Sequence, residues 1–105
     1  MLPLAKVQGL ISKHSQLEKD LSSGAIDKNS FAEKSKEYSD LNEIIKEARE
    51  YSEFEKNKSE LEILIADENG DKEMKDLAET ELEELKKNNQ INEKKIKIFL
   101  LPKDE

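Results

Sequence analysis

Apolar residues near the N-terminus recur at steps of three and four positions, with charged and amide residues between them. They are Leu4, Val7, Leu10, Ile11, Leu17 and Leu21, and His14 lies on the same stripe. This spacing is typical of one face of an amphipathic helix. Pro3 is tolerated in a first helical turn, and Gly24 is suited to a left-handed cap at the other end. The pattern predicts a short helix over residues 4–21.

A second pattern of this kind continues without any glycine or proline until the chain reaches Gly70. Its main apolar positions are Phe31, Tyr38, Leu41, Ile45, Ala48, Phe54, Leu61, Leu64 and Ile65. Ser30 followed by Glu33 fits a capping box at its start. We therefore expect one long helix over about residues 29–66, bent near Tyr51-Ser52.

The segment Asp67-Glu68-Asn69-Gly70-Asp71 is the clearest turn in the chain, because Asn-Gly is a strong turn dipeptide. Asp71 is a suitable cap for the helix that follows. The next seam residues alternate in steps of four and three, as in a heptad pattern. They are Met74, Ala78, Leu82, Leu85, Asn89, Asn92, Ile96 and Phe99.

Two amides interrupt the apolar seam of this last helix, and one proline predicts where the helix ends. Asn89 and Asn92 place polar groups in the seam, which we interpret as a register-setting layer or an exposed stretch. Partner binding by these amides is the alternative. Pro102 biases Leu101 towards an extended conformation, so we expect the helix to end by about residue 100.

These elements predict an all-α fold for residues 1–105. It consists of a short N-terminal helix plus two long antiparallel helices that form a coiled-coil-like hairpin. The chain has 105 residues, 41% of them charged and only 5% aromatic, which favours a thin seam between helices over a thick core. The same composition leaves a mostly disordered acidic segment as a rival, which circular dichroism would distinguish.

The charge balance argues against diffuse binding to nucleic acid. The formal net charge is −7, whereas phosphate contacts need a dense lysine and arginine face. One group of lysines lies in the C-terminal half of the last helix: Lys86, Lys87, Lys94, Lys95 and Lys97. We interpret it as a solvated face, and a basic patch for RNA or an acidic partner is the alternative.

Candidate chemistry is sparse. His14 is the one histidine and shares an apolar stripe, so we interpret it as a seam histidine and not as a catalytic base or zinc ligand. Residues 67–71 lack the ligand spacing of a calcium loop, and no glycine-rich phosphate loop is present. Cysteine is absent. We therefore expect no enzyme activity, catalytic residue, metal or other cofactor.

No stretch of the sequence is long and apolar enough to span a membrane, and the N-terminus lacks the features of a signal peptide. We therefore expect a soluble cytoplasmic protein with no membrane partner.

Three stretches of the sequence carry a resemblance: residues 31–41, FAEKSKEYSDL, residues 74–85, MKDLAETELEEL, and residues 100–104, LLPKD. They resemble bacterial class I peptide chain release factors, in which the first is similar to a segment near the start of the protein and the second to a later one. Residues 100–104, LLPKD, match the end of the family's N-terminal domain and are the most specific of the three. They favour the release factor 1 type, which reads UAA and UAG, over the release factor 2 type.

The resemblance implies that residues 1–105 are the excised N-terminal domain of a longer factor. The apolar run Ile98–Leu101 would then meet following domains instead of water. The family's Gly-Gly-Gln loop and stop-codon motif do not occur here. The domain would position the factor near the ribosomal stalk base, against ribosomal protein and RNA. The turn 67–71 or the loop 22–30 is the expected point of contact.

An unrelated helical-hairpin interaction module is the alternative, and the coding sequence beyond Glu105 would distinguish the two. A homodimer of the isolated domain also stays open, because an exposed apolar seam favours association.

Overall fold

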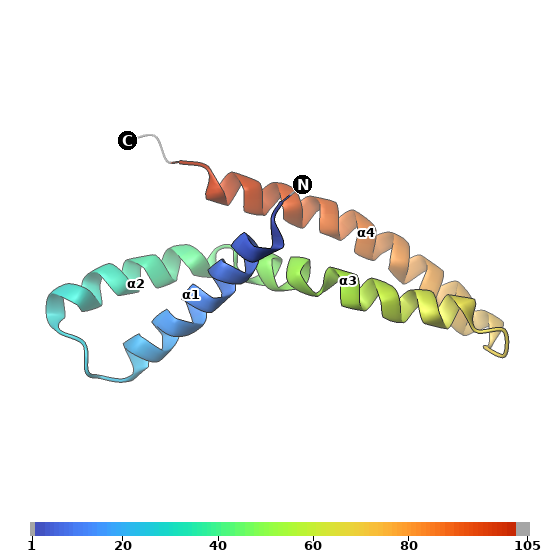
Figure 1. Cartoon of the computed structure of the whole chain (residues 1–105), viewed down its shortest axis with the longest axis horizontal. Helices are drawn as coiled ribbons and strands as arrows, with labels where there is room; N and C mark the ends of the chain where they lie inside the picture. Colours follow the sequence, from blue (N-terminus) through green and yellow to red (C-terminus); the bar gives the residue numbers. More distant parts are fainter. Residues whose placement is uncertain (1, 103–105) are drawn as a thin grey trace.

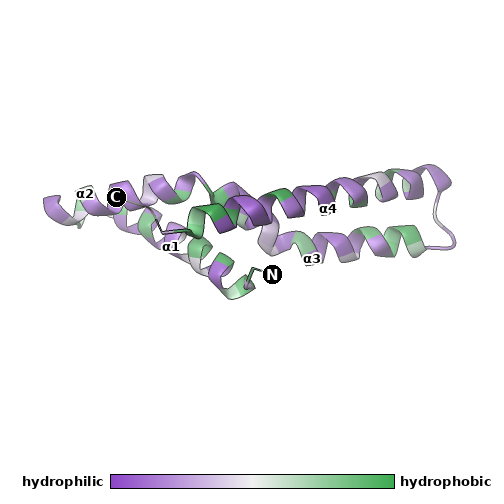
Figure 2. Cartoon of the chain, turned by 90° about the horizontal axis from the view of Figure 1, so that it is seen from above, coloured by the Kyte–Doolittle hydropathy of each residue, from purple (hydrophilic) through white to green (hydrophobic). Residues whose placement is uncertain are grey.

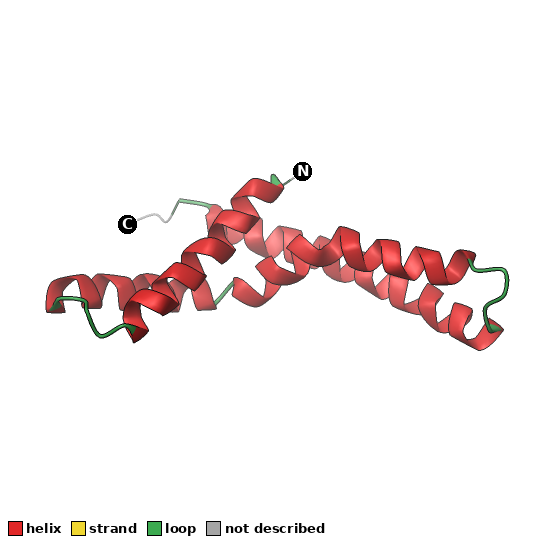
Figure 3. Ribbon diagram, turned by 60° about the horizontal axis from the view of Figure 1, so that its bottom comes forward, coloured by secondary structure: helices red, strands yellow, loops and turns green. Residues whose placement is uncertain are grey.

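The computed structural model describes residues 2–102, and all regular structure in this range is helical. The helices are α1 (Leu4–Ser22), α2 (Lys28–Asn42), α3 (Ile45–Ala66) and α4 (Lys72–Leu100). Figure 3 shows short loops joining them and no strand in the described range. The expected all-α class is confirmed.

The first helix matches its expected bounds to within a residue. Pro3 precedes α1 as its N-cap, and the N–H of Ser23 donates to the carbonyl of Lys19 at its end. Gly24 has a φ of 71°, which is the left-handed conformation expected after a helix C-terminus. Glycine is favoured there because it has no side chain to clash with the backbone.

The expected single helix over residues 29–66 is wrong. The chain breaks at Glu43-Ile44 and not near Tyr51-Ser52, which lies inside α3. The N–H groups of Glu43 and Ile44 bond to carbonyls three residues back, and Ile44 has φ −121° and ψ −7°. The physical reason is tertiary, because α1 packs against both α2 and α3, whereas α3 packs most extensively along α4. The backbone turns at Glu43-Ile44 so that α3 can follow α4 while α2 stays against α1.

The expected capping box at Ser30 and Glu33 is also wrong. Asp27 is the N-cap of α2, and its carboxylate accepts a hydrogen bond from the N–H of Ser30 at 2.8 Å. An aspartate in this position satisfies one of the free N–H groups of the first turn, so α2 begins before Ser30.

The α3–α4 hairpin agrees with the sequence pattern. Asp71 caps α4 by accepting from the N–H of Glu73 at 3.3 Å, and α4 ends at Leu100. Leu101 is extended, with φ −66° and ψ 142°, as expected before a proline. In Figure 1 the two helices lie side by side over most of their length, joined by the turn at one end of the molecule.

The small core lies where α1, α3 and α4 meet. Five buried residues form it, namely Leu2, Val7, Ile44, Ala48 and Ile96, with Leu10, Ile11, Tyr51 and Phe99 packed around them. Val7, Ala48 and Ile96 have no exposed surface. Figure 2 shows hydrophobic colouring in this region and predominantly hydrophilic colouring on α2.

The molecule is elongated. Its radius of gyration is 18.4 Å and its extents are 60 × 33 × 19 Å. A compact domain of this length would have a radius of gyration of about 13 Å. The α1–α2 loop and the α3–α4 turn lie at opposite ends of the long axis (Figure 1).

Candidate functional site

His14 is a buried structural residue between α1 and α2. Its side chain is 4% exposed and stacks on Tyr38, with ring centroids 4.7 Å apart. Its Nε2 lies 2.6 Å from Oδ1 of Asn42. An amide oxygen can only accept, so Nε2 donates this bond. The arrangement agrees with the interpretation of His14 as a seam histidine.

A polar cluster crosses from α3 to α4. One oxygen of the Glu50 carboxylate accepts from Nδ2 of Asn88 at 2.9 Å and from Nδ2 of Asn92 at 3.0 Å. Asn92 is only 3% exposed. The hydrogen bonds from Asn92 and then Asn88 lower the pKa of Glu50 below its ordinary value. Asn92 and Glu50 therefore form a part-buried polar contact between α3 and α4, which agrees with a polar layer and not with an exposed stretch.

Asn89 does not share this role. It is half-buried, and its Oδ1 has no hydrogen-bond partner within the described residues. The sequence pattern did not identify Glu50 as the partner of Asn92, because Glu50 comes from another helix.

Two peripheral ion pairs hold α1 against α2. Nζ of Lys34 lies 2.9 Å from Asp20, and Nζ of Lys13 lies 3.0 Å from Glu37. The hydrogen bond from Lys34 lowers the pKa of Asp20. Surface ion pairs of this kind contribute little to the free energy of unfolding. We therefore expect these two pairs to favour the observed orientation of α1 against α2 without adding much stability.

Two of the five lysines in the C-terminal half of α4 pair with carboxylates. Lys95 lies 3.9 Å from Glu47, and Lys97 lies 2.9 Å from Glu93 one turn away. Both lysines are balanced by nearby carboxylates, which favours the solvated-face interpretation.

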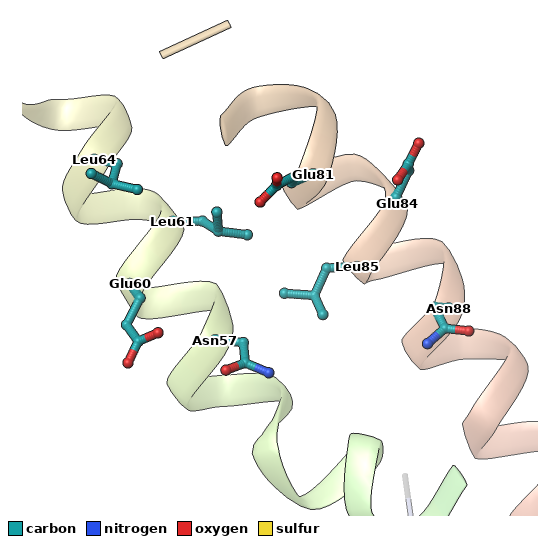
Figure 4. Close-up of a pocket in the computed structure, with 8 residues that line it drawn as sticks. All are labelled: Asn57, Glu60, Leu61, Leu64, Glu81, Glu84, Leu85 and Asn88. Carbon is teal, nitrogen blue, oxygen red and sulfur yellow. The ribbon is translucent and has the colours of Figure 1, made fainter. Parts of the chain in front are cut away.

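The seam between α3 and α4 opens into a groove near the turn. The groove has a volume of about 550 Å³ and is lined by Asn57, Glu60, Leu61, Leu64, Glu81, Glu84, Leu85 and Asn88. In Figure 4, Leu61 and Leu85 point towards each other across it, whereas Glu60 and Glu84 point outwards at its margins. We call this feature the distal groove. It combines an apolar floor with three carboxylates, which the sequence pattern of a continuous seam did not predict.

Most of the net charge of the chain lies in the segment that forms this groove. Residues 57–88, which include every residue that lines the groove, carry eleven carboxylates and five lysines, a net charge of −6. The whole chain carries −7, so the remaining residues together carry −1. The turn 67–71, one of the two expected contact points, lies inside this acidic segment. The loop 22–30, the other, lies at the opposite end of the molecule (Figure 1).

A second exposed apolar surface lies at the C-terminal end of α4. Ile98 is 68% exposed and Leu101 is 62% exposed, and both line a shallow pocket with Phe99 and Ile44. This part of the expected apolar run is thus open to solvent, as the sequence suggested. Residues 103–105, which complete the LLPKDE ending, lie outside the described residues.

Neither a metal site nor a membrane span is found in residues 2–102. No three histidine, aspartate or glutamate side chains there are grouped so that they could hold a metal ion. No helix in the described part of the chain has the length and apolarity needed to cross a bilayer.

Comparison with known proteins identifies the family. The model of the family described as PCRF domain matches residues 10–105. Peptide chain release factor 1 of Pelagibacter ubique is 59% identical over all 105 residues, which span 29% of that protein. Peptide chain release factor 1 of Rhizobium rhizogenes is 35% identical over 98% of the chain, which spans 28% of that protein. No solved structure matches significantly. The chain therefore belongs to the PCRF domain family and corresponds to the N-terminal domain of a peptide chain release factor.

Proposed function

We propose that residues 1–105 form the N-terminal domain of a class I release factor of the release factor 1 type. The complete factor would direct translation termination at UAA and UAG codons on cytoplasmic ribosomes. The observation that carries this proposal is the 59% identity to a peptide chain release factor 1 over the whole chain. The chain spans less than a third of that relative, so decoding and catalysis are assigned to regions outside it.

The proposed role of the domain is positioning and not catalysis. An elongated helical body 60 Å long can bridge the rest of a factor and a distant partner. In this proposal the apolar surface around Ile98 and Leu101 packs on a following domain, and a tip of the body meets the ribosomal stalk base. The exposure of both residues supports an apolar partner at that end.

The coding sequence beyond Glu105 tests the identity of the parent protein. We expect a continuation that encodes a further domain and a Gly-Gly-Gln loop. Sequencing the locus provides the answer directly. A stop codon immediately after Glu105 would contradict the proposal and favour an independent helical interaction module.

Charge reversal tests which tip makes the ribosomal contact. Glu68 lies in the α3–α4 turn and Lys28 is the first residue of α2, and both side chains are exposed. The turn and the α1–α2 loop lie at opposite ends of the long axis (Figure 1). In the full factor, we expect Glu68→Lys to weaken ribosome binding about threefold and Lys28→Glu to leave it unchanged, because loss of one or two exposed charge contacts has an effect of this size. Binding to stop-codon-programmed ribosomes and the rate of peptide release provide the measurement. If both values stay unchanged even in the double variant, neither loop makes the contact.

A further inference from the structure

We propose that the distal groove binds a basic, partly apolar segment of another protein, in which leucine-like side chains alternate with lysine or arginine. This inference adds a binding partner to the proposed positioning role. It rests on that proposal only for the idea that the segment belongs to a protein on the ribosome. The binding chemistry itself depends only on the groove. Its three supports are the open seam, the arrangement of the carboxylates, and the charge of the surrounding surface.

The first support is an apolar floor that the hairpin does not cover. Leu61 and Leu85 face each other across the groove but are only half-buried, and Leu64 is 47% exposed. The same helices bury Ala48 and Ile96 completely nearer the core. The distal groove therefore retains apolar surface that a side chain of a partner can cover. The binding free energy gained in this way is proportional to the apolar area removed from water.

The second support is the position of the acidic side chains. Glu60 on α3 and Glu81 and Glu84 on α4 all line the groove, so carboxylates flank the apolar floor on both helices. A lysine or arginine of a docked segment could reach a carboxylate on either side while an apolar neighbour enters the floor. This pattern of anchors and flanking charges is typical of helix-in-groove recognition.

The third support is the surrounding charge, which selects among partner classes. The net charge of −6 over residues 57–88 repels nucleic acid phosphates and a second copy of the same face. It attracts cationic protein segments and increases their association rate. Apolar surface together with concentrated negative charge thus favours a basic protein over RNA, an anionic membrane or self-association.

A matched set of peptides tests the proposal with the 105-residue chain. The probe is a labelled peptide with leucines at i, i+3, i+4 and i+7 and lysines between them, measured by fluorescence anisotropy. A second peptide replaces the leucines with serine, and a third replaces the lysines with glutamate. We expect the first to bind best and to weaken as salt rises. An RNA hairpin with the same label should bind more weakly than the first peptide.

Matched variants then locate the site. E60Q/E81Q/E84Q removes three carboxylates from the groove, and E62Q/E79Q/E83Q removes three from other exposed positions on the same part of the hairpin. We expect the groove variant to weaken binding about tenfold and the control less than threefold, because each exposed ion pair contributes only a few-fold. Leu64→Ser should weaken binding, whereas Ile63→Ser, at an exposed position outside the groove, should not.

Circular dichroism is used to check that each variant keeps the wild-type helicity. Equal weakening by the two triple variants would overturn the proposal, as would equal binding of the leucine and serine peptides or tighter binding of the RNA hairpin. These results are independent of the coding sequence beyond Glu105. The groove proposal and the release factor proposal can therefore fail separately.

Discussion

Replacing Ile96 with alanine is expected to lower the free energy of unfolding by about 3–4 kcal/mol, the middle of the range for truncating a buried isoleucine. Ile96 has no exposed surface and belongs to the cluster that joins α1, α3 and α4. Alanine would leave a cavity among Val7, Ile44 and Ala48. The loss would be a large part of a total stability of about 5–15 kcal/mol. Urea unfolding followed by circular dichroism provides the measurement.

Ile91 provides the matched control on the same helix. It is 51% exposed, so Ile91→Ala should change the free energy of unfolding by less than about 0.5–1 kcal/mol. If the I96A variant is already unfolded in buffer, I96V removes one methylene, and we expect it to cost about 1 kcal/mol. Equal effects of I96A and I91A would show that the three-helix cluster is not the stabilising core.

Replacing Glu50 with alanine is expected to lower the free energy of unfolding by about 2 kcal/mol at neutral pH, because a buried amide loses its charged acceptor. Asn92 is 3% exposed, and its Nδ2 donates to Glu50 at 3.0 Å. Asn88 is exposed, so its amide can form a hydrogen bond with water when Glu50 is removed. Its hydrogen bond to Glu50 therefore contributes less to the free energy of unfolding. Glu53→Ala, at an exposed glutamate on the same helix, is the control and should cost less than about 0.5 kcal/mol.

The effect of Glu50→Ala should also depend on pH. The hydrogen bonds from Asn92 and Asn88 lower the pKa of Glu50 in the folded protein below its ordinary value of 4.5. A lowered folded-state pKa stabilises the fold above the unfolded-state pKa, and this contribution is lost as the pH falls through the folded-state value. The difference in unfolding free energy between wild type and E50A should therefore shrink as the pH is lowered from neutral through this range. A constant difference from neutral pH to below that pKa would show that the Glu50 charge has no role.

Local sequence signals predicted most helix ends correctly. Gly24, Asp71 and Pro102 act through the conformation or hydrogen bonding of a few neighbouring residues, and each marks an end where it was expected. Periodicity also identified the stripe of α1, in which Val7 and Leu17 are buried. Such features are visible in a sequence because their causes are local.

Features that depend on packing between distant segments were not predicted. The break at Ile44 has no glycine or proline to mark it, because it results from α3 packing most extensively along α4 whereas α2 packs mainly against α1. Glu50 could not be paired with Asn92 from spacing alone, since 42 positions separate them. The distal groove was missed for a related reason, because a regular seam pattern does not reveal how closely Leu61 and Leu85 approach.

The off-centre position of the small core has a consequence for amide hydrogen exchange. Backbone amides near Ala48 and Ile96 can exchange only when the whole cluster opens, so their protection measures global stability. Around the 67–71 turn, few side chains are buried, and opening requires only the last turn of α3 and the first turn of α4 to fray. That end of the hairpin can therefore reshape around a bound surface at low free-energy cost, while the three-helix cluster keeps its orientation.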